Sequence, residues 1–304
     1  MPGASLVITD LHRRFGDRVA LDGLGLDVPP GEVVGLLGPN GSGKTTAMRT
    51  VFGVVRPDSG TVTYGGRPLD AAIRRRFGYM PEERGLYPQM RVAEQVTYFG
   101  RLFGMSARDA GAAAAGLLDR LGLADRAGDS LESLSLGNQQ RVQLAVALVH
   151  EPEALILDEP FSGLDPVAVD DLSHIIRDAA TGGRTVLFSS HQLDLVEGIC
   201  DSVRIIDAGR LVLEGRVADL QRDSGRRTLR IAVDDPAAVE AVGGAGWQRA
   251  PGGMLRRPLA ASEDPLEVLQ PVRAATRVTD LAVEAPSLSE LFLDAVGRAE
   301  DAHA

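Results

Sequence analysis

Apolar runs of strand length alternate with stretches of helical spacing along the first two thirds of the chain. Three such runs are "GEVVGLLG" at 31–38, "EALILDE" at 153–159 and "GRTVLFSSH" at 183–191. Runs of this kind are typical of parallel strands in a sheet that helices cover on both faces. The helical spacing between them therefore predicts β-α-β units and an α/β fold.

Segments with other patterns surround these units. Residues 5–30 predict two short antiparallel strands at the edge of the fold, closed by "PPG". Residues 92–150 are helical in pattern, with an alanine-rich stretch and an amphipathic run after Gly137, and they predict an inserted helical lobe. The hairpin "RIIDAGRLVLEG" closes this part near residue 220, so residues 1–220 are expected to form one domain.

The remaining residues, 221–304, change character. Strand-like and helix-like segments follow one another there in the order β-α-β-β-α-β, which predicts a small α+β accessory domain of the ferredoxin-like type. The last segment, "PSLSELFLDAVG", has the pattern of a capped amphipathic helix.

Composition narrows the function class. With 304 residues and 44% hydrophobic content, the chain is long and apolar enough for a globular protein of two domains. A net charge of −10 argues against a nucleic-acid partner, because such binding needs clustered positive charge. Cys200 is the one cysteine, so an intramolecular disulfide is excluded. The pattern predicts neither a signal peptide nor a membrane span, and we expect the chain itself to be soluble.

The most specific motif is "GPNGSGKTT", which matches the Gly-x4-Gly-Lys-Thr pattern of a phosphate-binding loop. Glycines let consecutive backbone N–H groups turn toward phosphate oxygens, and the helix that follows adds the positive end of its dipole. Lys44 is expected to reach the β- and γ-phosphates, and Thr45 to ligate Mg²⁺. The candidate binding residues of this loop are Gly38, Pro39, Asn40, Gly41, Ser42, Gly43, Lys44, Thr45 and Thr46.

Two adjacent acids end the second apolar run. At the carboxyl edge of the sheet Asp158 could hold Mg²⁺, and Glu159 could polarise a water for attack on the γ-phosphate. A turn with an N-cap is the alternative interpretation, and it would prevail without the phosphate loop. His191 ends the third run, where a γ-phosphate contact is geometrically available, although a lone histidine is usually structural. The catalytic candidates are therefore Glu159, His191 and Lys44.

Motifs in this order resemble the nucleotide-binding subunit of ATP-binding cassette (ABC) transporters over residues 5 to about 220. The loop is similar to the Walker A motif of that family, and "LILDE" is similar to Walker B. Phe15 resembles the aromatic residue that stacks on adenine, where tyrosine is common. Asp165, which ends "SGLD", resembles the loop that contacts a partner across a dimer, and His191 the switch histidine. The resemblance implies a P-loop NTPase cassette with ATP and Mg²⁺ as cofactors.

The segment "LSLGN" resembles the family signature. The resemblance implies a head-to-tail pair of copies, in which Ser135 and Gly137 of one copy contact the γ-phosphate held by the other. Asn138 stands where glutamine is usual and can still offer an amide. Leu136 stands where the family has glycine, which requires a negative φ. Glu82 stands where the loop toward the membrane partner usually has glutamine, and we expect it to approach Mg²⁺ more directly.

The functional expectation is an ATP-hydrolysing subunit that energises a separate membrane permease. Similarity of "GYMPEERGLYPQM" and "LSLGNQQRVQ" to a bacterial exporter subgroup with an extra C-terminal domain implies export, with sodium or drug efflux as the kind of role. The chain would then be cytoplasmic and peripheral on the inner face of the membrane. The alternative is an ABC ATPase that acts on ribosomes or DNA without a permease. One cassette, no heptad run and an acidic chain disfavour it.

Overall fold

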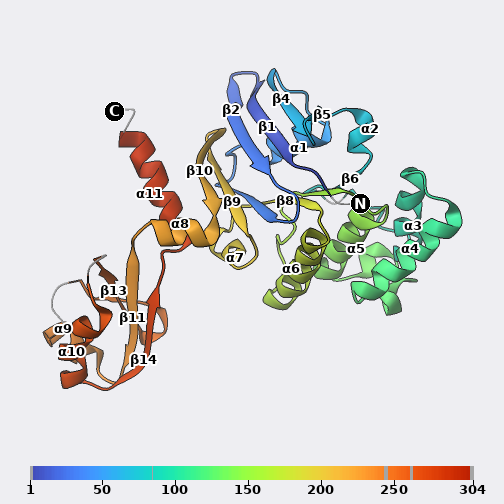
Figure 1. Ribbon diagram of the computed structural model, residues 1–304. Helices are drawn as coiled ribbons and strands as arrows, with labels where there is room; N and C mark the ends of the chain where they lie inside the picture. The colour runs from blue at the N-terminus through green and yellow to red at the C-terminus, as the bar shows by residue number, and fades with distance from the viewer. Residues whose placement is uncertain (1–2, 84, 243–245, 261–262, 302–304) are drawn as a thin grey trace. The chain divides into compact units, whose positions relative to one another are not determined.

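Two compact units make up the protein, Met1–Gly215 and Arg216–Ala304. The computed structural model (Figure 1) describes residues 3–83, 85–242, 246–260 and 263–301. No helix in this described part is long and apolar enough to cross a membrane.

An antiparallel sheet begins the first unit, with the strand order β2-β1-β4-β5. The predicted antiparallel pair is confirmed, since β1 and β2 pair from Leu6↔Val28 to Phe15↔Arg18. The strands are not short as predicted but have 10 and 11 residues, and β1 also pairs with β4. Gly65 and Gly66 have φ values of +58° and +73° and form the tight turn of the hairpin from β4 to β5. The strands are β1 (Leu6–Phe15), β2 (Arg18–Val28), β4 (Ser59–Tyr64) and β5 (Arg67–Pro68).

A six-stranded sheet with the order β10-β9-β3-β8-β7-β6 lies at the centre of the first unit. Its neighbours from β9 to β6 pair parallel, and the side chains of β3, β7 and β8 are buried throughout, as their apolar runs predict. The short strand β6 was not predicted, because its four residues stand between a run of arginines and a proline. The strands are β3 (Val33–Leu37), β6 (Phe77–Met80), β7 (Ala154–Leu157), β8 (Thr185–Ser190), β9 (Ser202–Asp207) and β10 (Arg210–Arg216).

Helices accompany the strands, and the predicted helical segment between β6 and β7 contains α3, α4 and α5; α3 and α4 are drawn in green in Figure 1. The amphipathic pattern expected after Gly137 is wrong, because every residue of α5 from Val142 to Leu148 is buried. A helix enclosed on all sides carries apolar residues all round, and the buried Gln143 is accommodated because its amide donates to the Pro81 carbonyl. The helices are α1 (Lys44–Phe52), α2 (Ala71–Arg74), α3 (Val92–Leu102), α4 (Ala107–Arg120), α5 (Leu136–Leu148), α6 (Pro166–Thr181) and α7 (Leu193–Glu197), with 3-10 turns at Ala124–Arg126 and Leu131–Ser133.

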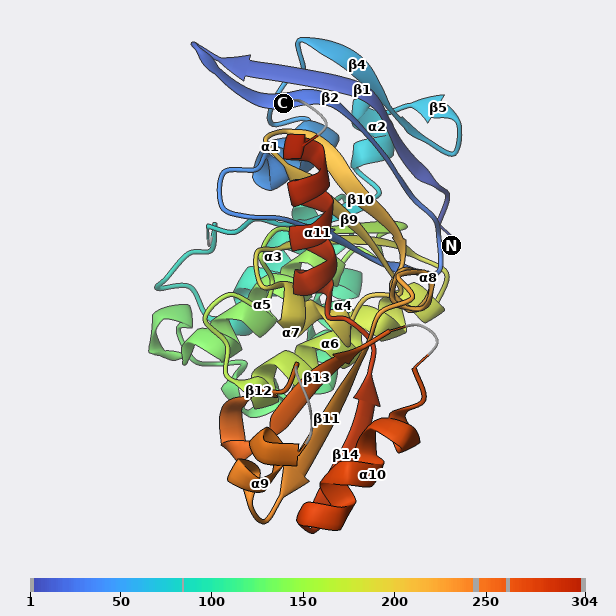
Figure 2. The ribbon, with the colours of Figure 1, turned by 90° about the vertical axis from the view of Figure 1, so that its left-hand side faces the viewer.

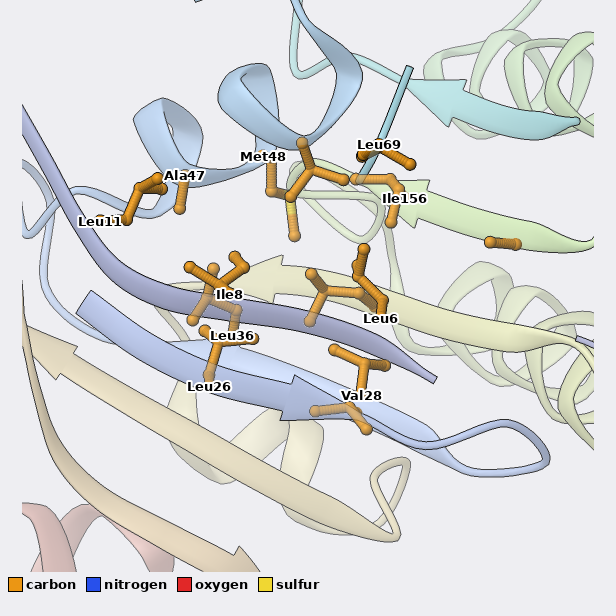
Figure 3. Close-up of a cluster of buried hydrophobic side chains, with 14 of the residues drawn as sticks. Leu6, Ile8, Leu11, Leu26, Val28, Leu36, Ala47, Met48, Leu69 and Ile156 are labelled. Atoms are coloured by element: carbon orange, nitrogen blue, oxygen red, sulfur yellow. The ribbon is translucent and has the colours of Figure 1, made fainter. Parts of the chain in front are cut away.

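One core joins the two sheets of the first unit through α1. Ile8 of β1, Leu26 of β2, Leu36 of β3 and Met48 of α1 belong to this core, and each is at most 5% exposed (Figure 3). Burial of such side chains contributes roughly 1.5–3 kcal/mol each. The core therefore fixes α1 between the sheets and with it the loop that leads from β3 into α1.

The second unit contains a four-stranded antiparallel sheet with the order β12-β13-β11-β14. Helices α9 and α10 pack on one face of it, where Val239 and Leu269 meet Leu229 and Leu255 (Figures 1 and 2). A capping box starts the last helix, since Ser287 Oγ accepts from the Glu290 N–H and Glu290 Oε2 from the Ser287 N–H. The elements are α8 (Val217–Asp223), β11 (Arg227–Val233), α9 (Pro236–Val242), β12 (Gln248–Arg249), a 3-10 turn (Pro251–Gly253), β13 (Leu255–Leu259), α10 (Pro265–Ala275), β14 (Val278–Glu284) and α11 (Leu288–Asp301).

Candidate functional site

The topology of the parallel sheet brings together three strand ends that are followed by candidate functional residues. Strand β8 lies between β3 and β7, and all three run in the same direction. The phosphate loop follows β3, Asp158 and Glu159 follow β7, and His191 follows β8. Ligands of parallel α/β sheets bind at the carboxyl ends of the strands. The three predicted motifs thus meet at one edge.

The phosphate loop depends on glycine at two positions. A Cβ on Gly38, where φ is +150°, would lie 2.1 Å from the carbonyl oxygen of Ile206. A Cβ on Gly43, where φ is +111°, would lie 2.5 Å from the carbonyl oxygen of Ala20. Gly43 is also the N-cap residue of α1, so the loop leads directly into the positive end of that helix. Any other residue at these positions would displace the backbone around the loop.

Lys44 is held inside the loop. Its ammonium group donates hydrogen bonds to the carbonyl oxygens of Gly38 and Pro39, over 2.7 and 3.1 Å, and lies 3.8 Å from Glu159 Oε1. The side chain is 6% exposed. Burial lowers the pKa of Lys44, whereas the carboxylates of Glu159, Asp158 and Glu82 act in the opposite direction. The site therefore places a desolvated cation where an anionic ligand would satisfy it.

Asp158 is fully buried beneath the loop. Its Oδ1 accepts hydrogen bonds from Ser189 Oγ over 2.6 Å and from Thr45 Oγ1 over 3.3 Å. Its Oδ2 has no hydrogen-bond partner among the described residues. Burial raises the pKa of Asp158, and the two hydroxyl hydrogen bonds oppose that shift. A buried carboxylate oxygen without a partner is costly, so this atom indicates an unmet ligand.

Glu159 combines an unusual backbone conformation with close polar contacts. Its φ is +51°, a left-handed conformation that costs roughly 1–2 kcal/mol outside glycine. Its N–H donates to Ser189 Oγ over 2.8 Å, and its Oε2 lies 3.0 Å from His191 Nδ1. Strain of this kind is concentrated at functional sites. The acid and the histidine predicted as catalytic residues are therefore in direct contact.

A cavity of about 550 Å³ opens beside these groups. Phe15 is 46% exposed at this cavity, and the Arg13 guanidinium lies 4.5 Å above its ring. Arg18 and Ala20 also line the cavity, although the sequence motifs did not point to them. Arg18 donates a hydrogen bond to the Gly41 carbonyl over 3.3 Å. The other lining residues are Asn40, Gly41, Gly43, Lys44, Thr45, Thr46, Glu82 and Glu159.

Four of the predicted residues lie elsewhere in the first unit. Ser135, Gly137, Asn138 and Asp165 line a separate cavity of about 330 Å³. Ser135 caps α5 by accepting from the Asn138 N–H over 3.4 Å, and Asp165 caps α6 by accepting from Ala168. Two helix N-termini therefore face this second cavity, and helix N-termini favour anions.

Leu136 has the backbone conformation that its position requires. It is the first residue of α5, and it is not among the described non-glycine residues with positive φ. The negative φ that a leucine needs in place of the family's glycine is thus present. Its side chain is 38% exposed and lines the second cavity.

The donors at the first cavity suit a magnesium nucleotide. Thr45 Oγ1 and Asp158 Oδ2 are hard oxygen ligands, and Ser42 Oγ is a second buried polar atom without a partner in the described residues. No group of three or more His, Cys, Asp or Glu side chains in the described part could hold a metal ion. Proteins usually bind Mg²⁺ through one or two side chains together with phosphate oxygens and water.

Ser189 is a further residue of this site that sequence reasoning missed. It contacts both acids, yet it belongs to no phosphate-loop or acid motif. The sequence feature that could have indicated Ser189 is a hydroxyl at the end of a buried apolar strand, two positions before His191.

A glycine-rich loop between β3 and α1, together with two buried acids at the end of β7, defines a P-loop nucleoside triphosphatase. The predicted α/β cassette fold is thereby confirmed. Comparisons with known proteins identify the family. The family model described as ABC transporter matches residues 21–162. The ABC transporter ATP-binding protein YhaQ of Bacillus subtilis (strain 168) is 37% identical over 96% of this chain and 98% of its own length.

Two further matches agree with that result. A daunorubicin resistance ATP-binding protein of Streptomyces coeruleorubidus is 33% identical over 98% of this chain and 97% of its own length. The solved structure of an ATP-binding subunit of an ABC transporter has 31% identity and a TM-score of 0.65, over 72% of this chain and 93% of that chain. The chain belongs to the ABC transporter ATP-binding proteins, and it is an ATPase that energises a membrane permease.

Proposed function

We propose that the first cavity binds Mg·ATP and that its residues carry out hydrolysis. The backbone of residues 38–46 surrounds the phosphates, and Lys44 neutralises the β- and γ-phosphates. Thr45 and Asp158 hold Mg²⁺, with Glu82 at the rim of the same cavity. Phe15 stacks on the adenine base, since its exposed ring faces the cavity. The main support for this proposal is that the phosphate loop contacts two buried acids, Glu159 through Lys44 and Asp158 through Thr45.

Glu159 acts as the general base in this proposal. Its carboxylate is only 7% exposed, and it lies between Lys44 at 3.8 Å and His191 at 3.0 Å. A carboxylate in this position accepts a proton from the water that attacks the γ-phosphate. His191 fixes the carboxylate and is within reach of the γ-phosphate. Mg²⁺, when bound, neutralises the charge on the transferred phosphoryl group.

A second copy of the chain completes each site. Ser135, Gly137 and Asn138 line a cavity of their own, apart from the phosphate loop of the same chain. Two helix N-termini at this second cavity suit the γ-phosphate of a nucleotide held by another copy. A head-to-tail pair would bring each second cavity, with Asp165, over the first cavity of its partner. ATP would then close the pair, and hydrolysis would open it.

The permease docks on the helical lobe in this proposal. Tyr98 and Leu102 of α3 are 38% and 62% exposed, and Tyr87 is 51% exposed, with its ring 6.0 Å from that of Tyr98. An exposed apolar group of this kind marks an interaction surface. Tyr87 lies five positions after Glu82, so the surface is connected to the nucleotide cavity along a short stretch of chain.

The transport direction is export, and the cellular place is the cytoplasmic face of the membrane. The relative named for daunorubicin resistance supports export, because it aligns over 98% of this chain and 97% of its own length. We assign the ATPase to residues 1–215 and an accessory role to residues 216–304, which have a sheet and core of their own.

The substitution Glu159→Gln tests the hydrolytic role. It removes the proton-accepting oxygen but keeps the shape of the side chain, so we expect ATP binding to persist, hydrolysis to fall by 10²-fold or more, and ATP to trap a dimer. Fluorescent-nucleotide binding, phosphate release and size-exclusion chromatography measure the three effects. Glu132→Gln, at an exposed position, is the matched control. Hydrolysis at the wild-type rate in Glu159→Gln would exclude Glu159 as the base.

A further inference from the structure

Ser189 is a buried hydroxyl at the end of β8 that contacts both acids of the site. It is 0% exposed, donates to Asp158 Oδ1 over 2.6 Å, and accepts from the N–H of Glu159 over 2.8 Å. A serine hydroxyl has one proton to donate and lone pairs to accept with. The two hydrogen bonds therefore use its donor and acceptor at once and fix its orientation.

The hydrogen bond to Asp158 determines which carboxylate oxygen is available. Ser189 and Thr45 both donate to Oδ1, whereas Oδ2 has no partner among the described residues. The parallel register sets this geometry, because Leu157 pairs with Phe188 and the residues that follow them face each other. Without the hydroxyl, a buried carboxylate would lose its shortest hydrogen bond and could rotate.

The hydrogen bond from Glu159 stabilises a strained backbone. A φ of +51° is unfavourable for glutamate, and the N–H of that residue is satisfied by Ser189. The same conformation directs the Glu159 carboxylate to His191. One hydroxyl thus holds the side chain of the first acid and the backbone of the second.

We propose that Ser189 is a positioning residue for ATP hydrolysis, which orients Asp158 toward Mg²⁺ and Glu159 toward the attacking water. This proposal rests on the proposed function of the first cavity. Ser189 does not touch the nucleotide itself, because it is enclosed behind the two acids.

Ser189→Ala tests the proposal, with Ser190→Ala as the matched control. Ser190 is 2% exposed, but its hydroxyl accepts from the Gln192 N–H and contacts neither acid in the described structure. In Ser189→Ala we expect kcat to fall roughly tenfold or more, because a hydrogen bond to a charged buried group is lost. The Mg²⁺ concentration that half-saturates binding of a fluorescent ATP analogue should rise severalfold. Binding of the analogue without Mg²⁺ should stay unchanged, and Ser190→Ala should alter none of these values.

Two further variants separate positioning from simple folding. Ser189→Thr keeps the hydroxyl and should recover kcat and the Mg²⁺ dependence, and Ser189→Cys replaces Ser189→Ala if that variant does not fold. Wild-type kcat and Mg²⁺ dependence in the variant without the hydroxyl would overturn the proposal, as would equal losses in Ser190→Ala. A wild-type chain without ATPase activity would instead overturn the proposed function.

Discussion

Single residues in rare backbone conformations shape the candidate nucleotide site. Gly38 and Gly43 adopt φ values of +150° and +111°, and a side chain at either would meet a carbonyl oxygen. Glu159, at +51°, has a left-handed conformation despite its side chain. The glycines are needed because the loop passes close to backbone of the neighbouring strands. Glu159 instead depends on the contacts that hold it.

Replacing Gly38 with alanine should abolish nucleotide binding. The new Cβ would lie 2.1 Å from the Ile206 carbonyl oxygen, so the loop must move away from its phosphate-binding shape. Titration with a fluorescent ATP analogue measures the loss. The control is Gly116→Ala in α4, where a Cβ would meet nothing within 4 Å. That control should bind normally and gain about 0.5–1 kcal/mol in stability, because alanine favours helix over glycine. Normal binding in Gly38→Ala would contradict the role of this glycine.

At the scale of elements, the sequence predicted the helices and strands whose own residues show a clear pattern. The buried runs of β3, β7 and β8 are continuous in apolar residues, and the loop motif fixes the start of α1. Weak elements were missed. The strand β6 has four residues, and the seven-residue α8 follows directly on β10. Their formation depends on neighbours that no sequence window contains.

The candidate site likewise contains residues that the sequence predicted and residues that it did not. Phosphate-loop residues and the acids have motif signals. The structure brings most of the loop and Glu159 to one cavity with Phe15 and Glu82, and Asp158 is hydrogen-bonded to Thr45 of that loop. Ser189 and Arg18 have no such signal, because their contacts arise from the pairing of distant strands and from a close approach of β2 to the loop. The chemical roles of all these residues stay predictions until they are measured.

A partly buried histidine at the contact between α3, α5 and β6 predicts that the stability of the protein depends on pH. His150, just after α5, stacks on Phe103 with ring centroids 3.6 Å apart, and its Nε2 hydrogen-bonds to the carbonyl of Phe77 over 3.1 Å. Its Nδ1 is buried without a partner in the described residues. Burial lowers the pKa of His150 from 6.5 to about 4. The folded state therefore binds fewer protons here than the unfolded state between these values.

Stability should consequently fall as the pH falls from 6.5 to about 4, since the unfolded chain takes up the proton first. Urea unfolding midpoints across this range measure the effect. His150→Phe removes the titrating group, so its midpoints should depend less on pH than those of the wild type, whatever the offset in stability. Equal slopes in His150→Phe and wild type would contradict this assignment.

At the scale of the whole molecule, the proposed function gives one chain two complementary halves of an ATPase site. Phosphate-loop residues and Glu159 line the first cavity, whereas Ser135 and Gly137 line the second. Because the two cavities are separate in a single chain, the account requires two copies for turnover. A monomer should bind ATP yet hydrolyse it poorly.

Mixing two inactive variants tests this claim most directly. Lys44→Ala removes the phosphate-binding cation, and Ser135→Arg blocks the second cavity. In a mixed head-to-tail pair, one site carries both substitutions and the other carries neither. Each variant alone should show background ATPase activity, and the equimolar mixture should regain Mg²⁺-dependent hydrolysis. A mixture that stays as inactive as its components would contradict a site shared between two copies.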